Sequence, residues 1–447
     1  MKGENLLRSW KEIAAYLGCD RRTCFRWEKK LSLPVHRIEG SAKGSVFAYK
    51  EELDQWILER SKANGAHPGK APEIHAARRK RWLSTRTALI LFHLAVVVGL
   101  GLGFFFIGRK SYPTRPHNFK IDGSVLTILD GKGRELWTFD TGLKNLVEDA
   151  AYRTHFQVKR RDALDRPLFP QLLIEDINVD GRAEVLFSTQ TADEFHEGDL
   201  FCFNDHGREL WRFKAGRELK FGNKVYSPDF RITSVSAENL VGDRELEVLV
   251  ICFHRPDWLC QAVLLSSHGE VLGEYWNSGQ LNDYAFADLN QDGREEILLS
   301  GLNNEYGRGC LAVFDPRSFQ GSSPQTSSQF RCIDLKAGTE KFYMLIPRTD
   351  ADRGLNSVDA VEALDVLANR QISVRASLSG LYYLFNFALE LQYVNPSHKF
   401  EQLYREALRA GRVKSTLNQD YLDRLGRDVL YWDGTRWTDH PSMSNKW

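Results

Sequence analysis

The chain has 447 residues, of which 42% are hydrophobic and 27% are charged. At roughly 100–200 residues per domain, this length predicts two to four domains, and the composition excludes a wholly disordered or collagen-like chain. The net charge of +1 hides a division: residues 1–86 carry 19 Lys and Arg against 10 Asp and Glu, and the remainder is net negative. A basic N-terminal part and an acidic remainder favour different partners for the two ends.

Residues 5–60 have the periodicity of three short helices and a β-hairpin. Ser9 and Glu12 have the spacing of a capping box, and apolar residues then recur at helical intervals until Gly18. A second helix follows, with its basic residues on the faces away from Cys24 and its other apolar residues. We expect β-like segments at 35–38 and 46–49 and a third helix at 51–59.

The run SWKEIAAYLGCDRRTCFRWEKKLSLPVHRIEGSAKGSVFAYKEELDQWI resembles the winged helix-turn-helix of the MerR-like and excisionase-type DNA-binding families. The resemblance implies that the second helix enters the major groove of double-stranded DNA and that the hairpin acts as a wing. Phe25 departs from the polar residue usual there, and would either touch a thymine methyl or weaken direct readout. The alternative is a solvated basic face that keeps the domain soluble. The predicted DNA contacts are Arg21, Arg22, Thr23, Phe25, Arg26, Lys29, Lys30, Arg37 and Lys43.

Residues 88–107 (ALILFHLAVVVGLGLGFFFI) form an uncharged run of twenty residues, the length that crosses a ~30 Å hydrocarbon core. A flexible basic linker at 61–87 and a short linker at 108–117 flank it. Six Lys and Arg precede the run and four follow it, a bias that predicts a cytoplasmic N-terminus. We therefore expect a single-pass protein of the bacterial inner membrane, with its C-terminal domain periplasmic or extracellular.

Two sets of repeats occupy the acidic part. IEDINVDGRAEVLF (174–187) and FADLNQDGREEILL (286–299) match closely, and ENLVGDRELEVLV (238–250) is a decayed copy. The second set is DGKGRELWTF, NDHGRELWRF and SHGEVLGEYW. Repeats at this period indicate propellers, solenoids or arrays, and the short apolar runs after each turn indicate strands. We expect a propeller over 118–447, with five to seven blades and helices at 397–410 and 417–425.

The D-x-N-x-D-G core places oxygen ligands where they can converge on one hard cation such as calcium. With a glutamate at the ninth position and a strand following, it resembles the FG-GAP and VCBS repeats of integrin-type propellers. The alternative is a metal-free, Asx-rich hairpin turn, and we expect no metal in the decayed copy. The resemblance implies two Ca²⁺ sites, one formed by Asp176, Asn178, Asp180, Arg182 and Glu184, the other by Asp288, Asn290, Asp292, Arg294 and Glu296.

Seven cysteines are too few for a disulfide scaffold. Cys252 could bond with Cys260 and Cys310 with Cys332 in an oxidising compartment, or all four could be unpaired and buried. No nucleophile elbow, P-loop, H-E-x-x-H or C-x-x-C motif occurs, so we expect no enzyme.

The predicted fold class is therefore multidomain: a small α+β winged helix-turn-helix, one transmembrane helix, and an all-β propeller with some helices near the C-terminus. The predicted function is a membrane-anchored one-component transcriptional regulator, in which a DNA-binding head is coupled to a calcium-binding propeller that senses or binds an unknown extracytoplasmic ligand or protein. A homodimer is left open. The first alternative is a membrane-anchored adhesion or carbohydrate-binding surface protein with a protein-binding head. The second is a tethered propeller hydrolase or lyase.

Overall fold

The computed structural model describes residues 5–19, 21–37, 46–63, 115–163, 165–192, 198–255, 259–354, 360–376 and 380–441. The chain divides into two compact units, Met1–Lys110 and Ser111–Trp447.

The first unit is a small α+β arrangement. Helix α1 begins after Ser9, whose Oγ accepts a hydrogen bond from the Glu12 backbone N–H at 3.2 Å, and ends at Gly18 with φ +65°. The predicted cap and stop are therefore confirmed. A three-stranded sheet in the order β1-β3-β2 completes the unit. Its elements are β1 (Leu6–Leu7), α1 (Trp10–Leu17), α2 (Arg21–Leu31), β2 (His36–Arg37), β3 (Val46–Tyr49) and α3 (Lys50–Ala63).

Small and aliphatic side chains fill the core of the first unit. Ile13, Cys24 and Leu53 are fully buried, one from each helix. Trp27 and Trp56 pack against this core with their ring centroids 5.7 Å apart. The Trp56 Nε1–H donates to the Leu31 carbonyl at 3.0 Å, and this hydrogen bond connects α3 to the C-terminal end of α2.

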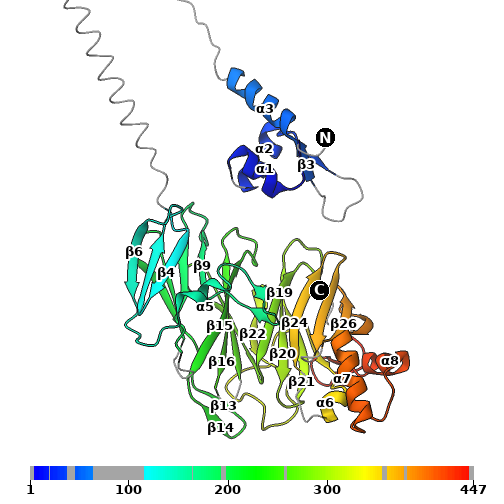
Figure 1. The fold of residues 1–447 in the computed structure, drawn as a ribbon. Coiled ribbons are helices and arrows are strands. Elements are labelled where there is room, and N and C mark those ends of the chain that lie inside the picture. Colours follow the sequence, from blue (N-terminus) through cyan, green and yellow to red (C-terminus); the bar gives the residue numbers. More distant parts are fainter. Residues whose placement is uncertain are drawn as a thin grey trace, which may run out of the picture. The chain divides into compact units, whose positions relative to one another are not determined.

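In the described ranges of the second unit, five sheets have three or more strands, and they are antiparallel apart from one added strand (Figure 1). We call them blades 1 to 5. Blade 1 holds β4 (Asn118–Asp122), β5 (Val125–Leu129) and β6 (Glu135–Asp140). Blade 2 holds β9 (Leu172–Glu175), β10 (Glu184–Ser188), β11 (Asp199–Phe203) and β12 (Glu209–Lys214). Blade 3 holds β15 (Phe230–Glu238), β16 (Glu247–His254), β17 (Cys260–Leu265) and β18 (Val271–Asn277), with β22 (Gln320–Ser322) added in parallel.

Blades 4 and 5 complete the series. Blade 4 holds β19 (Leu281–Ala287), β20 (Glu296–Asn303), β21 (Arg308–Phe314), β23 (Phe342–Ile346), β28 (Leu430–Trp432) and β29 (Trp437–Thr438). Blade 5 holds β24 (Val361–Leu367), β25 (Gln371–Ala376), β26 (Leu381–Asn386) and β27 (Leu391–Pro396). Because β28 pairs with β23, the C-terminal strands extend blade 4 and do not pair with blade 1. Two hairpins lie outside the blades: β7 (Arg160–Arg161) with β8 (Pro167–Leu168), and β13 (Leu219–Phe221) with β14 (Lys224–Tyr226).

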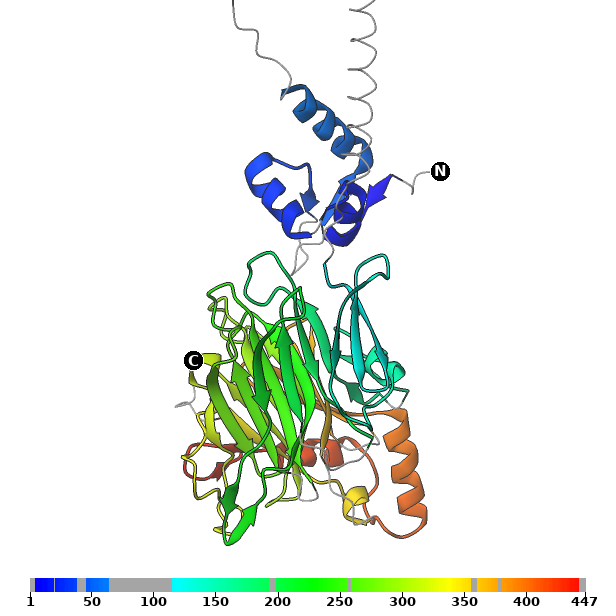
Figure 2. The ribbon, with the colours of Figure 1, turned by 90° about the vertical axis from the view of Figure 1, so that its left-hand side faces the viewer.

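The sheets of neighbouring blades lie side by side, as in a β-propeller (Figures 1 and 2). Hydrophobic clusters join each blade to the next. Within the described ranges, none of these clusters joins blade 5 to blade 1. Pairs of residues that share a cluster are Phe119 with Phe187 for blades 1 and 2, Leu186 with Val263 for blades 2 and 3, Leu264 with Ile297 for blades 3 and 4, and Met344 with Val374 for blades 4 and 5.

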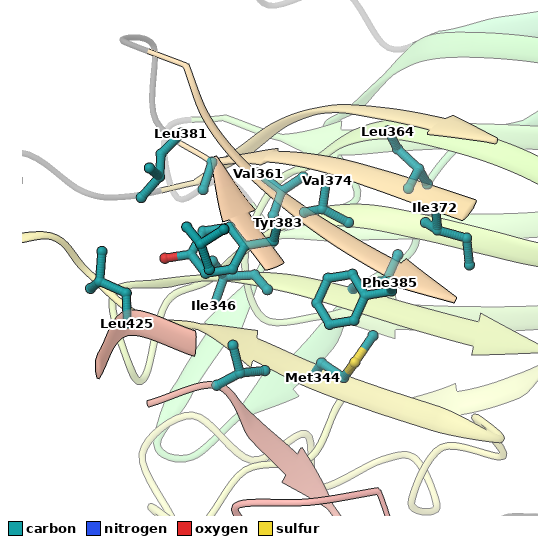
Figure 3. Packing of buried hydrophobic residues seen from close by; sticks show 14 of the residues in the cluster. Met344, Ile346, Val361, Leu364, Ile372, Val374, Leu381, Tyr383, Phe385 and Leu425 are labelled. Atoms are coloured by element: carbon teal, nitrogen blue, oxygen red, sulfur yellow. The ribbon is translucent and has the colours of Figure 1, made fainter. Parts of the chain in front are cut away.

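Helices cover the last blade. The helices α7 (His398–Arg409) and α8 (Gln419–Arg427) were predicted at these places and lie beside β27. Smaller helices are α5 (Asp149–Arg153), α6 (Asp350–Gly354) and the 3-10 turn η1 (Pro316–Ser318). Figure 3 shows Met344 and Ile346 of blade 4, Tyr383 and Phe385 of blade 5, and Leu425 of α8 meeting in one apolar layer.

The second set of sequence repeats forms a contact between neighbouring blades. Trp137 at the edge of blade 1 donates its Nε1–H to the Asp205 carbonyl in blade 2 at 3.2 Å, and Trp211 of blade 2 donates to the Ser267 carbonyl in blade 3 at 2.8 Å. Each indole lies against the glycine of that turn, Gly207 in one case and Gly269 in the other. The repeated motif is therefore a joint between blades.

The segment between blades 1 and 2 reaches blades 4 and 5. The Lys159 ammonium lies 2.5 Å from the Asp283 carboxylate of β19, and the Arg161 guanidinium lies 2.5 Å from the Asp365 carboxylate of β24. Burial raises the pKa of Asp283, and the Lys159 ammonium opposes that effect. These ion pairs connect the two ends of the blade series without an edge-to-edge sheet.

The predicted fold class was wrong in one part. It included a transmembrane helix, whereas no helix of the described ranges is long and apolar enough to cross a membrane. The predicted span at 88–107 lies outside the described residues, as do most of the predicted linkers at 61–87 and 108–117. The seven cysteines all lie in the described ranges and form no disulfide there, so neither predicted pair is bonded, and six of the seven are buried.

Candidate functional sites

Helix α2 has one face in the core and one basic face. Cys24 points into the core, Thr23 is half-buried, and Phe25 is exposed beside the basic residues. Within the described part of the chain, none of the basic side chains is paired with a carboxylate. We define the α2 basic face as the exposed residues Arg21, Arg22, Arg26, Lys29 and Lys30.

The aromatic residue at position 25 has a packing role. The Phe25 ring lies 4.3 Å from the Trp10 ring of α1, at an interplanar angle of 48°, while 41% of Phe25 is exposed. One side of the ring thus helps to hold α2 against α1. Of the two predicted wing contacts, Arg37 forms an ion pair with Glu28 of α2 at 2.7 Å, and Lys43 lies outside the described residues.

The two predicted metal loops have the same hydrogen-bond pattern at their aspartates. Asp176 accepts from the backbone N–H groups of Asp180 and Gly181, each at 3.0 Å. In the second loop Asp288 accepts from Asp292 and Gly293 at 3.1 and 3.0 Å. The asparagines of the two loops also correspond. Asn178 Oδ1 accepts from the Asp180 N–H, and Asn290 Oδ1 accepts from the Asp292 N–H.

A buried glutamate closes each loop at the start of a strand. Glu184 Oε2 accepts from the Ile177 N–H at 3.1 Å, and its Oε1 accepts from the Asn178 side-chain amide at 3.3 Å. Glu296 makes the corresponding bonds with Leu289 and Asn290, at 2.8 and 2.9 Å. The remaining predicted ligands, Arg182 and Arg294, donate their backbone N–H groups to Asp180 and Asp292.

These two glutamates have strongly shifted proton affinities. Burial raises the pKa of Glu184 to about 7, and the negative charges of Asp180 and Asp176 act in the same direction. Burial and the neighbouring aspartates Asp292 and Asp288 likewise raise the pKa of Glu296 to about 7. A cation among these carboxylates would stabilise the ionised form and reverse the shift.

The decayed copy keeps the glutamate and one aspartate, Asp243, but has Asn239 where the other loops have their first aspartate. Glu247 Oε2 accepts from the Leu240 and Val241 N–H groups at 2.8 and 3.0 Å, and Glu247 is 3% exposed. Burial also raises its pKa. Since the same strand start is made without the aspartate ladder, the glutamate has a structural role that does not depend on a metal.

The oxygen atoms of the two loops are of the types that bind calcium, but they are not arranged around a common point. Their carboxylate and amide oxygens are the ligand types that calcium takes. Across the described ranges, however, no group of three or more His, Cys, Asp or Glu side chains is placed to hold a metal ion. Several of the loop oxygens accept hydrogen bonds from the loop itself. Calcium therefore stays a prediction.

Cavities of the second unit were missed by the sequence analysis. They have volumes of about 670, 620 and 380 Å³. The smallest is lined by residues between Val147 and Arg255, which come from blade 2, blade 3 and the segment before them. No local motif marks such a site, because its residues meet only when the blades stack.

No family model and no curated protein matches the chain. Among solved structures, it is similar to the Dos1 propeller (8% identity, 62% of this chain, 65% of that chain, TM-score 0.32). It is also similar to BamB from Moraxella catarrhalis (10% identity, 62% of this chain, 59% of that chain, TM-score 0.28). A third is BBS1N in complex with ARL6DN (9% identity, 64% of this chain, 68% of that chain, TM-score 0.31). The chain spans less than two thirds of the first two, and likeness at these scores carries no functional argument.

Proposed function

We propose that the chain is a DNA-binding transcriptional regulator whose propeller unit binds a ligand or protein partner. The observation that carries this proposal is the α2 basic face. Five exposed cations lie on one helix of 11 residues, without carboxylate partners in the described part of the chain. Such a face matches the negative potential of duplex DNA, and an α-helix fits the major groove.

The neighbouring elements support the same proposal. Gly18 and the Trp10–Phe25 contact hold α1 against α2, so the basic helix is presented on a fixed support. The pair of strands β2 and β3 follows α2 as a wing would, and Arg37 connects it to α2 through Glu28. A solvated helix that only kept the protein soluble would not need these supports.

The test uses the full chain and a short duplex labelled with a fluorophore. We expect an affinity that falls steeply with salt, because each phosphate contact releases counterions. On an operator selected from a random library, Arg22→Ala or Arg26→Ala should weaken binding by about 1–3 kcal/mol if that arginine reads a base. Arg405→Ala, on the exposed side of α7 in the second unit, removes the same charge as a control.

Two results would contradict the DNA proposal. One is binding by the Arg22 and Arg26 variants that equals that of the parent and of the Arg405 variant. The other is the absence of any salt-dependent binding to duplex DNA. The α2 basic face would then serve solubility or bind an acidic protein.

We further propose that the loops at 176–184 and 288–296 bind calcium weakly. Short loops of this type that rely on water for the remaining ligands belong to the weak extracellular class, roughly 10⁻⁴–10⁻³ M. Calcium bound only by the folded form should raise the melting temperature of the second unit. Asp180→Ala or Asp292→Ala should each remove part of the gain, whereas Asp243→Ala in the decayed copy should not. A melting temperature that is indifferent to millimolar calcium and to chelator would reduce both loops to ordinary turns.

A further inference from the structure

The cavity of about 380 Å³ lies where β15 begins and β16 ends, and residues of α5 and of the β8 segment also line it. Its size is near the lower end of small-molecule sites, which run from about 300 to 1,000 Å³. Its walls combine three aromatic rings with three nitrogen-bearing side chains: Tyr152, Phe169, Phe253, His155, Arg231 and Arg255.

The charge in this cavity has one sign. Arg231 and Arg255 line it, and no Asp or Glu is among its described lining residues. The His155 Nδ1 atom is buried and has no hydrogen-bond partner within the described ranges. Burial lowers the pKa of His155, so the imidazole stays neutral and can donate from one nitrogen.

A hydrogen-bond network fixes the guanidinium of Arg231. Its Nε–H donates to Gln190 Oε1 at 2.9 Å. The Gln190 side-chain amide donates in turn to Gln171 at 3.1 Å and to the Ile232 carbonyl at 3.0 Å. Gln190 is only 7% exposed, and its backbone N–H is bonded to the Tyr152 hydroxyl at 2.9 Å. The arginine is therefore oriented before any ligand arrives, which lowers the cost of binding.

From this arrangement we propose that the cavity binds a small organic acid, whose anionic head is held by Arg231 and Arg255 and whose apolar body lies among the rings of Phe169, Phe253 and Tyr152. Guanidinium groups bind carboxylate and phosphate heads through paired N–H donors. The aromatic walls favour a ligand with a flat or aliphatic body over an inorganic ion. The site goes beyond the proposed DNA binding and would stand without it.

Calorimetric titration of the full chain tests the proposal with four probes. Benzoate and phenyl phosphate have an anionic head and an aromatic body, benzamide has the body without the charge, and inorganic phosphate has the charge without the body. We expect saturable binding of at least one aromatic acid, at least tenfold tighter than binding of benzamide or inorganic phosphate. Benzoate against phenyl phosphate decides between a carboxylate and a phosphate head.

Substitutions of the two lining arginines test whether the acid binds in this cavity. Arg231→Gln and Arg255→Gln should each weaken the bound acid at least tenfold, whereas Arg208→Gln, at an exposed arginine of the β11–β12 turn, should leave the affinity unchanged. Melting temperatures show whether each variant is folded. The proposal is overturned if neither acid binds, if benzamide or inorganic phosphate binds as well as the better acid, or if folded variants keep the parental affinity. The comparison of probes uses the unmodified chain, so it decides the matter even if a variant does not fold.

Discussion

The loops at 176–184 and 288–296 share their hydrogen bonds with each other, whereas the loop at 239–247 shares the bonds of its glutamate and the bond from the Glu245 N–H to Asp243, and lacks those of the first aspartate. In all three loops, the glutamate at the start of a strand accepts an N–H from the residue seven positions earlier, namely Ile177, Leu289 or Leu240. The first two loops add an aspartate that accepts two further N–H groups. Two parts that look like one motif in the sequence are therefore separable in the structure.

This difference shows which part the fold requires. A buried N–H group needs an acceptor, and the glutamate supplies it in every copy. The aspartates lie at the exposed end of the loop, where water can replace them. In the loop at 239–247 Glu247 makes the same strand start without the first aspartate, so a metal would be an addition to a turn that already forms.

The largest expected effect tests the shared part. Glu247→Ala and Glu184→Ala should each lower the free energy of unfolding by about 2–4 kcal/mol, because each leaves two hydrogen-bond donors without their acceptor. Urea unfolding of the full chain, followed by tryptophan fluorescence, measures the loss. Glu247→Gln retains an acceptor oxygen and should cost less. If Glu247→Ala costs under about 0.5 kcal/mol, the glutamate is not the common structural element.

The second set of repeats allows a similar comparison at the turns of the first three blades. Gly133, Gly207 and Gly269 occupy equivalent turn positions with φ of +76°, +81° and +81°. A Cβ on Gly207 would lie 2.7 Å from the Trp137 ring, whereas a Cβ on Gly133 would meet nothing within 4 Å. The backbone is the same in each turn, but only the later two turns have a tryptophan from the preceding blade against them.

Alanine at these glycines separates backbone strain from steric contact. Gly133→Ala should cost about 1 kcal/mol from the left-handed backbone alone. Gly207→Ala should cost about 1–3 kcal/mol more, because the new methyl group must displace the Trp137 indole. The same urea titration compares the two variants. Equal losses would mean that the indole moves freely and that the joint between blades is loose.

These cases show what the sequence can and cannot predict. The capping box at Ser9, the stop at Gly18 and the twin loops depend on residues within about nine positions of each other, and all were expected. The contact of Lys159 with Asp283 joins residues more than a hundred positions apart, and no local pattern indicates it. The same holds for the cavity around Arg231, whereas the expected range of five to seven blades includes the five in the described residues.

The transmembrane part of the predicted fold class was wrong, because no helix of the described ranges is long and apolar enough to cross a membrane. The run at 88–107, on which that prediction depended, lies outside the described residues. By contrast, the helices of the first unit were supported together by caps, periodicity and a turn residue. For Glu184 and Glu296 the sequence predicted only part of the result. Their position at the start of a strand was predicted from the resemblance to calcium loops, but their burial and their bonds to backbone N–H groups were not.

The last expected effect is a dependence of stability on pH that separates the two kinds of loop. In the folded chain the pKa of Glu184 and of Glu296 is raised from 4.5 to about 7. The folded state therefore binds more protons than the unfolded state between these values. The contribution of both groups is fully present below about pH 4.5 and is lost as the pH rises through about 7. In chelator, the second unit should melt at a lower temperature at about pH 8 than at about pH 5.5 through this contribution.

Replacement by glutamine identifies the groups responsible. Glu184→Gln and Glu296→Gln should each flatten the pH profile in chelator, because the amide does not titrate. If calcium binds the loops, it should hold both carboxylates ionised and flatten the profile of the parent in the same range. The pKa of Glu247 is also raised, by burial first and by Asp243 as well, but its loop has Asn239 and Val241 where the other loops have an aspartate and an asparagine, so the effect of Glu247→Gln should be the same with calcium and with chelator. A calcium-sensitive effect at Glu247 would show that the decayed loop still binds the ion, and the division between the two kinds of loop would then be wrong.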